Sequence, residues 1–288
     1  MELPLVVGVD GSDSSLEAVD WAVDEAARHH APLRLLHASR WERYEGGRPS
    51  FTSGRPSEVV MADHIIASSA ERARLRNPEL KVSGEVLPDD AASALLDAAP
   101  ASFALVTGSR GRSGTLGLLL GSVSLAVAAR AACPVFVVRG DEPSRQGSHG
   151  RIVVGVADSA DGSAAVRFAL REAEARGCAL HAVRAWRRPA HGGRPPVADD
   201  DASAYEEQAA ALLGDALRDE AGRPRADVHR EAVEGPAHRV LLDASAGADL
   251  IVVGAPRRHG HFGLQFGRVV HVLLHHSSCP VAVVPQPA

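Results

Sequence analysis

The chain contains one sequence pattern twice, and this internal repeat limits the possible folds more than any other feature. Three segments of the first half return in the same order in the second half, at an offset of 146 or 147 residues. Tandem copies of one pattern fold as copies of one unit, so we expect two similar domains. Residues 140–150 are polar and rich in Gly and Ser, as is typical of a linker, which predicts domains at 1–140 and 151–288. The matching segments are Val6–Val9 with Val153–Val156, Leu95–Ala98 with Leu241–Ala244, and Cys133–Val135 with Cys279–Val281.

Each copy alternates short apolar runs with stretches of helical spacing. Apolar runs such as 104–106 are typical of strands buried on both faces, and strand–helix alternation favours a parallel sheet under helices. The expected fold class is therefore α/β, as two tandem doubly wound, five-stranded, Rossmann-like sandwiches. Ser14 or Ser15 is expected to cap the first helix, and Asp89 or Asp90 the third. The predicted strands are 5–9, 33–37, 82–87, 103–107 and 135–138, then 152–156, 180–183, 228–233, 250–253 and 281–284; the predicted helices of the first copy are 14–30, 58–76, 91–99 and 122–131.

Composition excludes several classes of function. The net charge is −5, aromatic residues make up 4%, and Lys81 is the single lysine, so nucleic acid and anionic membranes are poor partners. No apolar run approaches the ~18 residues that span a bilayer. The start of the chain lacks the pattern of a signal peptide, and the three cysteines are odd in number and widely spaced. These features predict a cytoplasmic protein with buried thiols.

A glycine-rich loop follows the fourth predicted strand, between Gly108 and Ser122. Glycines let backbone amides approach a ligand, and the helix start at Gly121–Ser122 favours an anion. Arg110 and Arg112 lie in this loop, and no acidic residue occurs between Ala98 and Gly140. In a doubly wound sheet, ligands bind beyond the carboxyl ends of the strands, so the loop predicts a phosphate site. A flexible surface loop without a ligand is the alternative. Neither a Walker loop nor a dinucleotide fingerprint is present.

The spacing Gly108-x2-Gly111-x9-Gly121-Ser122 resembles the G-2x-G-9x-G-S/T nucleotide motif of the universal stress protein family. The first strand, which leads into Asp10, and the segment 132–135 before the last strand are also similar to that family. Two copies in one chain resemble the tandem members common in actinobacteria. The resemblance implies that the last strands of the two domains pair as an intramolecular pseudo-dimer, and a homodimer of chains is a further expectation.

The resemblance also implies an ATP site, with Mg²⁺ carried by the nucleotide. Asp10 would hold the adenosine end, the backbone of Ala38 would meet the adenine edge, and Gly108 would lie near the ribose. The phosphates would be cradled by Gly111, Gly121, Ser122 and Val123. Asp10 could instead be a turn or cap residue, since Asp-Gly sequences form turns unaided. The predicted nucleotide-binding residues are Val9, Asp10, Ala38, Gly108, Arg110, Gly111, Gly121, Ser122 and Val123.

The second copy keeps the spacing of the motif and changes its chemistry. Arg257 replaces the second glycine, where it adds bulk and penalises a left-handed backbone, and Arg268 replaces the serine at the helix start. Ala157 stands in the place of Asp10, although Asp158 follows it. We therefore predict no ATP binding of the family's kind in this half. This half could still bind an anion through a basic loop that contains Arg257, Arg258, His259 and His261. The alternative is that its site has decayed and that the domain is only a structural partner of the first.

Other residues that could carry chemistry are few. His271 and His275 lie one helical turn apart beside His276, but no nearby carboxylate completes a metal site, so no metal is predicted. Cys133 and Cys279 precede the last strands and are expected to be buried. No catalytic constellation is evident.

The first functional hypothesis is a non-catalytic, ATP-binding stress or dormancy regulator that an unidentified protein partner recognises. At most it would hydrolyse ATP slowly. The second is a scaffold protein of the same fold with an unused nucleotide site. A third, an adenylating enzyme, needs a phosphate motif after the first strand that residues 10–15 only faintly match.

Overall fold

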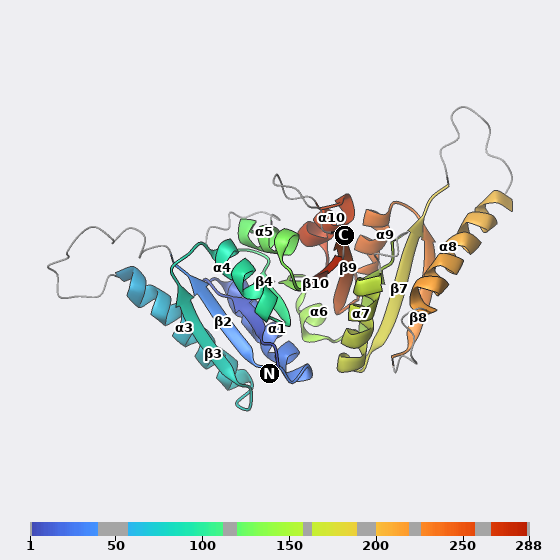
Figure 1. Ribbon diagram of the computed structural model, residues 1–288. Helices are drawn as coiled ribbons and strands as arrows, with labels where there is room; N and C mark the ends of the chain where they lie inside the picture. Colours follow the sequence, from blue (N-terminus) through green and yellow to red (C-terminus); the bar gives the residue numbers. More distant parts are fainter. Residues whose placement is uncertain are drawn as a thin grey trace. The chain divides into compact units, whose positions relative to one another are not determined.

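The computed structural model describes residues 2–39, 57–111, 120–157, 163–188, 200–218, 226–256 and 266–286. The chain divides into two compact units, Met1–Val138 and Arg139–Ala288. Each unit is an α/β sandwich built on five parallel strands, which confirms the expected fold class (Figure 1).

The sheet of the first unit has the strand order β3-β2-β1-β4-β5. Every neighbouring pair is parallel, with Leu5 opposite Leu33 and Ala104 on either side. The order reverses direction between β1 and β4, so their carboxyl ends form the switch point of a doubly wound sheet. The strands are β1 (Leu5–Gly8), β2 (Leu33–Ala38), β3 (Val82–Leu87), β4 (Ala104–Gly108) and β5 (Val135–Val138).

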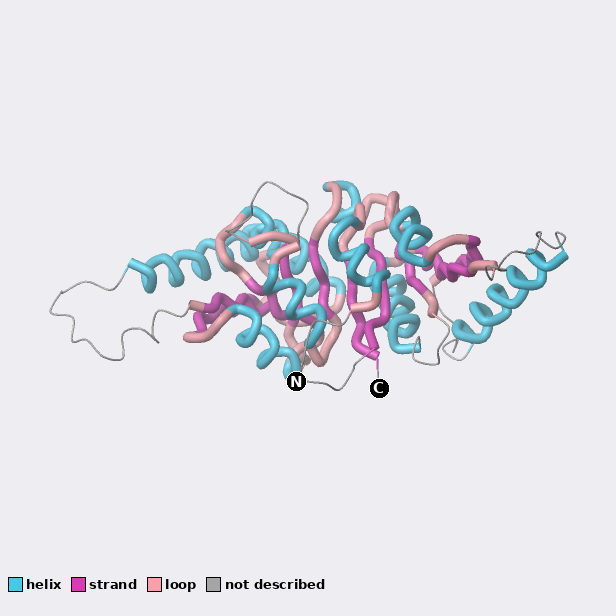
Figure 2. The backbone as a smooth tube through the Cα atoms, turned by 90° about the horizontal axis from the view of Figure 1, so that it is seen from above, coloured by secondary structure: helices cyan, strands magenta, loops and turns pink. Residues whose placement is uncertain are grey.

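Helices cover both faces of this sheet, which explains why β4 and β5 are buried along their whole length (Figure 2). One layer holds α1 and α3, which contact each other, and the other holds α4 and α5. Trp21 of α1 packs its ring 4.8 Å from the ring of Phe136 on β5. The helices are α1 (Asp13–Arg28), α3 (Ser57–Arg76), α4 (Ala91–Ala98) with the short 3₁₀ helix η1 (Ala99–Ala101), and α5 (Ser122–Arg130).

The helix caps test the sequence predictions at single residues. Asp90 caps α4, since its carboxylate accepts hydrogen bonds from the amides of Ala92 and Ser93, as predicted. The prediction for α1 was wrong: the cap is Ser12, whose hydroxyl accepts from the amide of Ser15. Four candidate cap residues follow one another here, and only the tertiary position of the chain leaving β1 selects among them.

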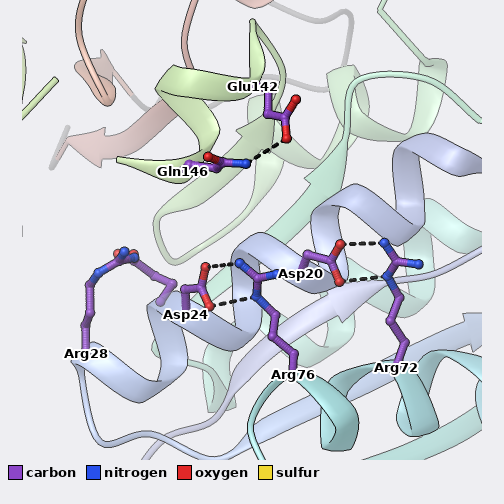
Figure 3. Close-up of polar contacts among 8 residues, drawn as sticks. Asp20, Asp24, Arg28, Arg72, Arg76, Glu142 and Gln146 are labelled. Carbon is purple, nitrogen blue, oxygen red and sulfur yellow. Dashed lines mark hydrogen bonds and ion pairs between the residues drawn. The ribbon is translucent and has the colours of Figure 1, made fainter. Parts of the chain in front are cut away.

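Two double ion pairs join α1 to α3 on the surface of the first unit (Figure 3). Arg72 donates two hydrogen bonds to the carboxylate of Asp20, at 2.7 and 2.5 Å. Arg76 repeats this geometry with Asp24, at 2.8 and 2.7 Å. Each pair raises the pKa of its guanidinium through the hydrogen bonds and the charge of the carboxylate. The four side chains are spaced one helical turn apart on each helix, so they form two parallel rungs.

The second unit repeats the topology, with the strand order β8-β7-β6-β9-β10. Strands β7 and β9 end three residues later than predicted, and β10 ends two residues later. Polar and proline residues continue the pairing with the neighbouring strand at these ends. The helix pairs α7–α8 and α9–α10 contact each other. The elements are β6 (Arg151–Gly155), α7 (Ser163–Arg176), β7 (Ala179–Trp186), α8 (Asp200–Arg218), β8 (Val228–Glu234), α9 (Ala237–Ala244), β9 (Leu250–Pro256), α10 (Arg268–His276) and β10 (Val281–Gln286).

The segment predicted as a linker contains a short helix, α6 (Glu142–Gln146), which packs within the second unit. Asp141 caps it by accepting from the amide of Ser144, and Gln146 donates to Glu142 at 2.7 Å (Figure 3). Gly140 lies so close to the backbone of Ser278 that any side chain would collide with it. The segment is therefore ordered structure rather than an extended tether.

Candidate functional site

A cavity of about 300 Å³ opens at the carboxyl ends of β1, β2 and β4 in the first unit. This is the switch point of the sheet, where doubly wound folds bind ligands. All nine residues predicted from the sequence line this one cavity: Val9, Asp10, Ala38, Gly108, Arg110, Gly111, Gly121, Ser122 and Val123. The sequence missed eight further lining residues: Gly8, Ser15, Leu36, His37, Ala91, Leu95, Thr107 and Ser124.

Asp10 forms a turn as well as lining the cavity. Its Oδ1 accepts hydrogen bonds from the amide of Ser12 at 3.0 Å and from the Ser12 hydroxyl at 2.6 Å. Gly11 has a φ of +78°, a conformation that side chains rarely adopt. The turn alternative raised by the sequence is therefore observed, and it fixes the Asp10 carboxylate at the cavity wall.

The glycines of the loop are required by close approach rather than by backbone conformation. A Cβ on Gly108 would lie 2.5 Å from the backbone oxygen of Ser14, so only glycine lets β4 end against the start of α1. A Cβ on Gly111 would lie 2.9 Å from Oδ2 of Asp10. Gly111 is absent from the described residues with positive φ, so the close approach to Asp10, and not a left-handed backbone, is what a side chain would disturb here.

Hydrogen bonds hold the two described ends of the glycine loop together. The amide of Arg110 donates to the hydroxyl of Ser14 at 3.2 Å, and the amide of Gly121 donates to the carbonyl of Ser109 at 2.9 Å. Ser124 donates to the carbonyl of Gly108 at 2.7 Å. The loop therefore leaves β4 and enters α5 at nearly the same place. Arg112 lies outside the described residues.

The first turn of α5 faces this cavity through Ser122 and Val123. The cap residue is Gly121, and no side chain among the described residues caps the helix. The amides at the start of a helix carry the positive end of its dipole and need acceptors. An anion in the cavity would supply them.

Four buried polar side chains in the cavity were not predicted as site residues, namely Ser15, His37, Thr107 and Ser124, and two of them bear on what the cavity can hold. His37, at the end of β2, places Nδ1 2.7 Å from the carbonyl of Val9, which requires a proton on that nitrogen for a hydrogen bond. Thr107 is 4% exposed, and its Oγ1 has no hydrogen-bond partner among the described residues. A buried hydroxyl without a partner is costly, and a ligand can satisfy it. The sequence signal that could have identified His37 and Thr107 is a polar residue at the end of an apolar strand run.

The corresponding positions of the second unit differ. Arg268 is the first residue of α10 and is exposed, and Ala157 follows β6 where Asp10 follows β1. Gly267 caps α10 without a side-chain hydrogen bond, as Gly121 caps α5. The basic residues Arg257, Arg258, His259 and His261, together with Asp158, lie outside the described residues.

The histidine rings of α10 lie close together at tilted angles, with centroids 4.4 Å apart for His271 and His275 and 6.1 Å apart for His275 and His276. Burial and the neighbouring charges of His271, His276 and Arg139 lower the pKa of His275. Among the described residues, no cluster of three ligating groups includes these histidines.

None of the three cysteines, all of which are described, forms a disulfide, and two are buried as predicted. Cys133 is 8% exposed and Cys279 is fully buried, whereas Cys178 is partly exposed, so the expectation of three buried thiols was wrong for Cys178. Burial raises the pKa of Cys279 to about 12, partly opposed by a hydrogen bond from Ser277. In the described part of the chain, no helix has the length and apolar character needed to cross a membrane.

The fold and the site together define a class: a tandem pair of doubly wound α/β domains, with a glycine-lined cavity at the switch point of the first. The model of the Universal stress protein family matches residues 3–139 and again residues 149–285. The chain therefore belongs to the universal stress protein family, as a tandem two-domain member.

Relatives agree with this assignment over the full length. A universal stress protein of Mycolicibacterium smegmatis is 32% identical over 290 residues, which cover 98% of this chain and 97% of that protein. The crystal structure of a universal stress protein from Archaeoglobus fulgidus shares the fold, with a TM-score of 0.72, 18% identity and 98% of both chains covered. A further universal stress protein, solved in complex with cAMP, is 30% identical and covers 48% of this chain and 98% of its own, with a TM-score of 0.36.

Proposed function

We propose that the first domain binds ATP and that the protein acts as a non-catalytic regulator of stress or dormancy in the cytoplasm. The observation that carries this proposal is the cavity at the switch point, which gathers every residue of the predicted nucleotide motif. A cavity of about 300 Å³ falls at the lower end of the size range of small-molecule sites.

The residues of the cavity fit the parts of an adenine nucleotide. Gly121, Ser122 and Val123 offer backbone amides and a helix dipole to the phosphates, without a side chain in the way. The unpartnered hydroxyl of Thr107 gains an acceptor from the ligand. The backbone of Ala38 at the end of β2 meets the adenine edge in this arrangement. Magnesium would arrive with the triphosphate, which supplies oxygen ligands of the kind it prefers.

The proposal assigns binding without efficient turnover. Oδ1 of Asp10 already accepts two hydrogen bonds, and Nδ1 of His37 is engaged by the carbonyl of Val9. The described lining residues contain no lysine to neutralise charge on a transferring phosphoryl group. Nucleotide binding would instead change a surface recognised by a protein partner. The partner, the pairing of the two domains and a homodimer of chains stay predictions.

In this proposal the second domain does not bind ATP in the family's manner. Arg268 puts a cation at the positive end of α10, and Ala157 removes the carboxylate that Asp10 supplies in the first domain. The alternative function is a scaffold whose nucleotide site is unused. The hydrogen bonds that already satisfy Asp10 without a ligand favour this second candidate.

A matched pair of variants separates these functions. Gly121 and Gly267 are equivalent helix caps, and both have room for a side chain. Because aspartate is a favourable cap residue, Gly121→Asp and Gly267→Asp should both fold. Gly121→Asp places a carboxylate where the phosphates would lie. We would identify nucleotide released on denaturation, and then titrate ATP into the emptied proteins by calorimetry.

The proposal expects one equivalent of ATP in the wild type and in Gly267→Asp, and none in Gly121→Asp. Two equivalents in the wild type would contradict the account of the second domain. No binding at millimolar ATP would support the scaffold.

A further inference from the structure

A second cavity, in the second unit, lies between the carboxyl ends of β7 and β8 and the helix α8. Its volume is about 510 Å³. Its strand residues Arg184 and Ala185 are the repeat counterparts of His37 and Ala38, but its other wall comes from α8, whose counterpart α3 does not line the first cavity. The lining residues are Arg184, Ala185, Trp186, Arg187, Tyr205, Gln208, Ala209, Leu212, Gly235 and Ala237.

The most unusual residue of this cavity is a buried arginine. Arg184 is 5% exposed, and its burial lowers the pKa of the guanidinium. A guanidinium carries five donors in a rigid fork, so it can serve more than one acceptor at once. At the matching position of the first unit stands His37, whose Nδ1 binds the backbone. The second unit has therefore exchanged a smaller ring for a permanent cation at the end of the strand.

A second hydrogen-bond donor in this cavity also suits a ligand that accepts hydrogen bonds. The indole nitrogen of Trp186, the last residue of β7, is buried and has no acceptor among the described residues. A buried N–H without an acceptor costs free energy that a ligand can recover. The backbone carbonyl of Trp186 is occupied by the amide of Gly235, at 2.8 Å, which holds the strand end in place.

The charge of the cavity favours an anion. Arg184 and Arg187 are cationic, and no aspartate or glutamate occurs among the described lining residues. Hydrogen bonds from a guanidinium to a carboxylate or phosphate are shorter and stronger than neutral ones.

The cavity also offers surfaces for a flat ring. Trp186 from the strand and Tyr205 from the helix both line it, and the small side chains of Ala185, Ala209 and Ala237 line it as well. Aromatic rings attract one another in offset or edge-to-face contacts, and a guanidinium also packs on a ring face.

We infer that the second domain binds a small aromatic anion, an aryl carboxylate or aryl phosphate, between Arg184, Trp186 and α8. The anionic group accepts from the Arg184 guanidinium and the Trp186 indole, and the ring packs between the two aromatic side chains. This site is independent of the ATP site proposed for the first domain.

Calorimetric titration of the full chain, with ATP present at saturation, tests the inference. The probes are 4-hydroxybenzoate and phenyl phosphate, with benzyl alcohol and cyclohexanecarboxylate as controls that lack the charge or the aromatic ring. We expect one equivalent of at least one aryl anion to bind, at least tenfold more tightly than either control. The anion that binds more tightly identifies the class of ligand. No binding of either aryl anion at millimolar concentration, or equal binding of benzyl alcohol, would overturn the inference.

Three variants locate the site. Arg184→Gln should weaken binding at least tenfold, and Trp186→Phe, which keeps a ring and removes one donor, about fivefold. Arg230→Gln changes an exposed arginine of β8 outside the cavity and should leave the affinity unchanged. Since Arg184→Gln can disturb folding, its circular dichroism is compared with the wild type, and Trp186→Phe provides the second measurement.

A folded Trp186→Phe protein with unchanged affinity would overturn the assignment. Binding that ATP abolishes would overturn it as well, because the anion would then occupy a nucleotide site. Failure of ATP to bind at all would count against the proposed function alone.

Discussion

The two domains share one topology, and they differ at the residues beyond the ends of their strands. In the first domain β4 ends at glycines that let the chain pass against Ser14 and Asp10, and a helix start opens into the cavity. In the second domain Arg268 stands at the helix start, and the strand β7 ends in Arg184 and Trp186. The comparison teaches that strand order decides where a site can form, whereas a few side chains decide what it can hold.

The largest effect is expected from transferring one residue between the domains. Gly111→Arg introduces the residue that the second domain has at this position, Arg257. Its Cβ would lie 2.9 Å from Oδ2 of Asp10, so the carboxylate must move and the side chain must enter the cavity. We expect the ATP affinity to fall at least a hundredfold, about 2.7 kcal/mol, by calorimetry. Ser148→Arg, in an exposed part of the linker, is the control with the same added charge. Equal ATP affinities in both variants would show that the glycine does not distinguish the domains.

A second comparison concerns Gly108, the last residue of β4, and its repeat counterpart Gly254 within β9. A Cβ on Gly108 meets the backbone of Ser14 at 2.5 Å, whereas on Gly254 it meets the end of the Gln286 side chain. Backbone yields less easily than a side chain, so Gly108→Ala should lower the free energy of unfolding by about 2–3 kcal/mol and Gly254→Ala by about 1 kcal/mol. Urea denaturation measures both. A larger loss for Gly254→Ala would reverse the comparison.

The last prediction depends on pH and concerns the equivalent cysteines Cys133 and Cys279. The folded pKa of Cys279 is raised to about 12, so above pH ~8.5 the unfolded state loses its proton first. Stability should then fall with rising pH, by up to about 1.4 kcal/mol per pH unit for this group. Cys279→Ala should flatten the decline between pH 8.5 and 10, measured by urea denaturation, relative to the Cys133→Ala control. An unchanged slope in Cys279→Ala would contradict the assigned cause.

The sequence predicted the fold well because strands such as β1, β4 and β5 are short apolar runs that the fold buries. Its spacing also placed nine residues around one cavity, since the carboxyl ends of parallel strands meet at one edge. It failed for the cap of α1, where four polar residues compete, and for Cys178, whose exposure depends on packing. Thr107, His37 and Arg184 were missed because their burial and partners arise between elements that are distant in sequence.

The ion pairs between α1 and α3 have a consequence for how a chain with two similar halves sorts its own helices. The positions that correspond to Asp20 and Asp24 are occupied by Arg167 and Arg171 on α7. The two helices occupy equivalent places in the repeat, so α7 is the helix that could compete with α1 for α3 while the chain folds. Arg72 and Arg76 attract the acidic face of α1 and repel the basic face of α7. The reversal of charge therefore favours pairing of α3 with α1, from its own half of the chain, over pairing with α7 from the other half.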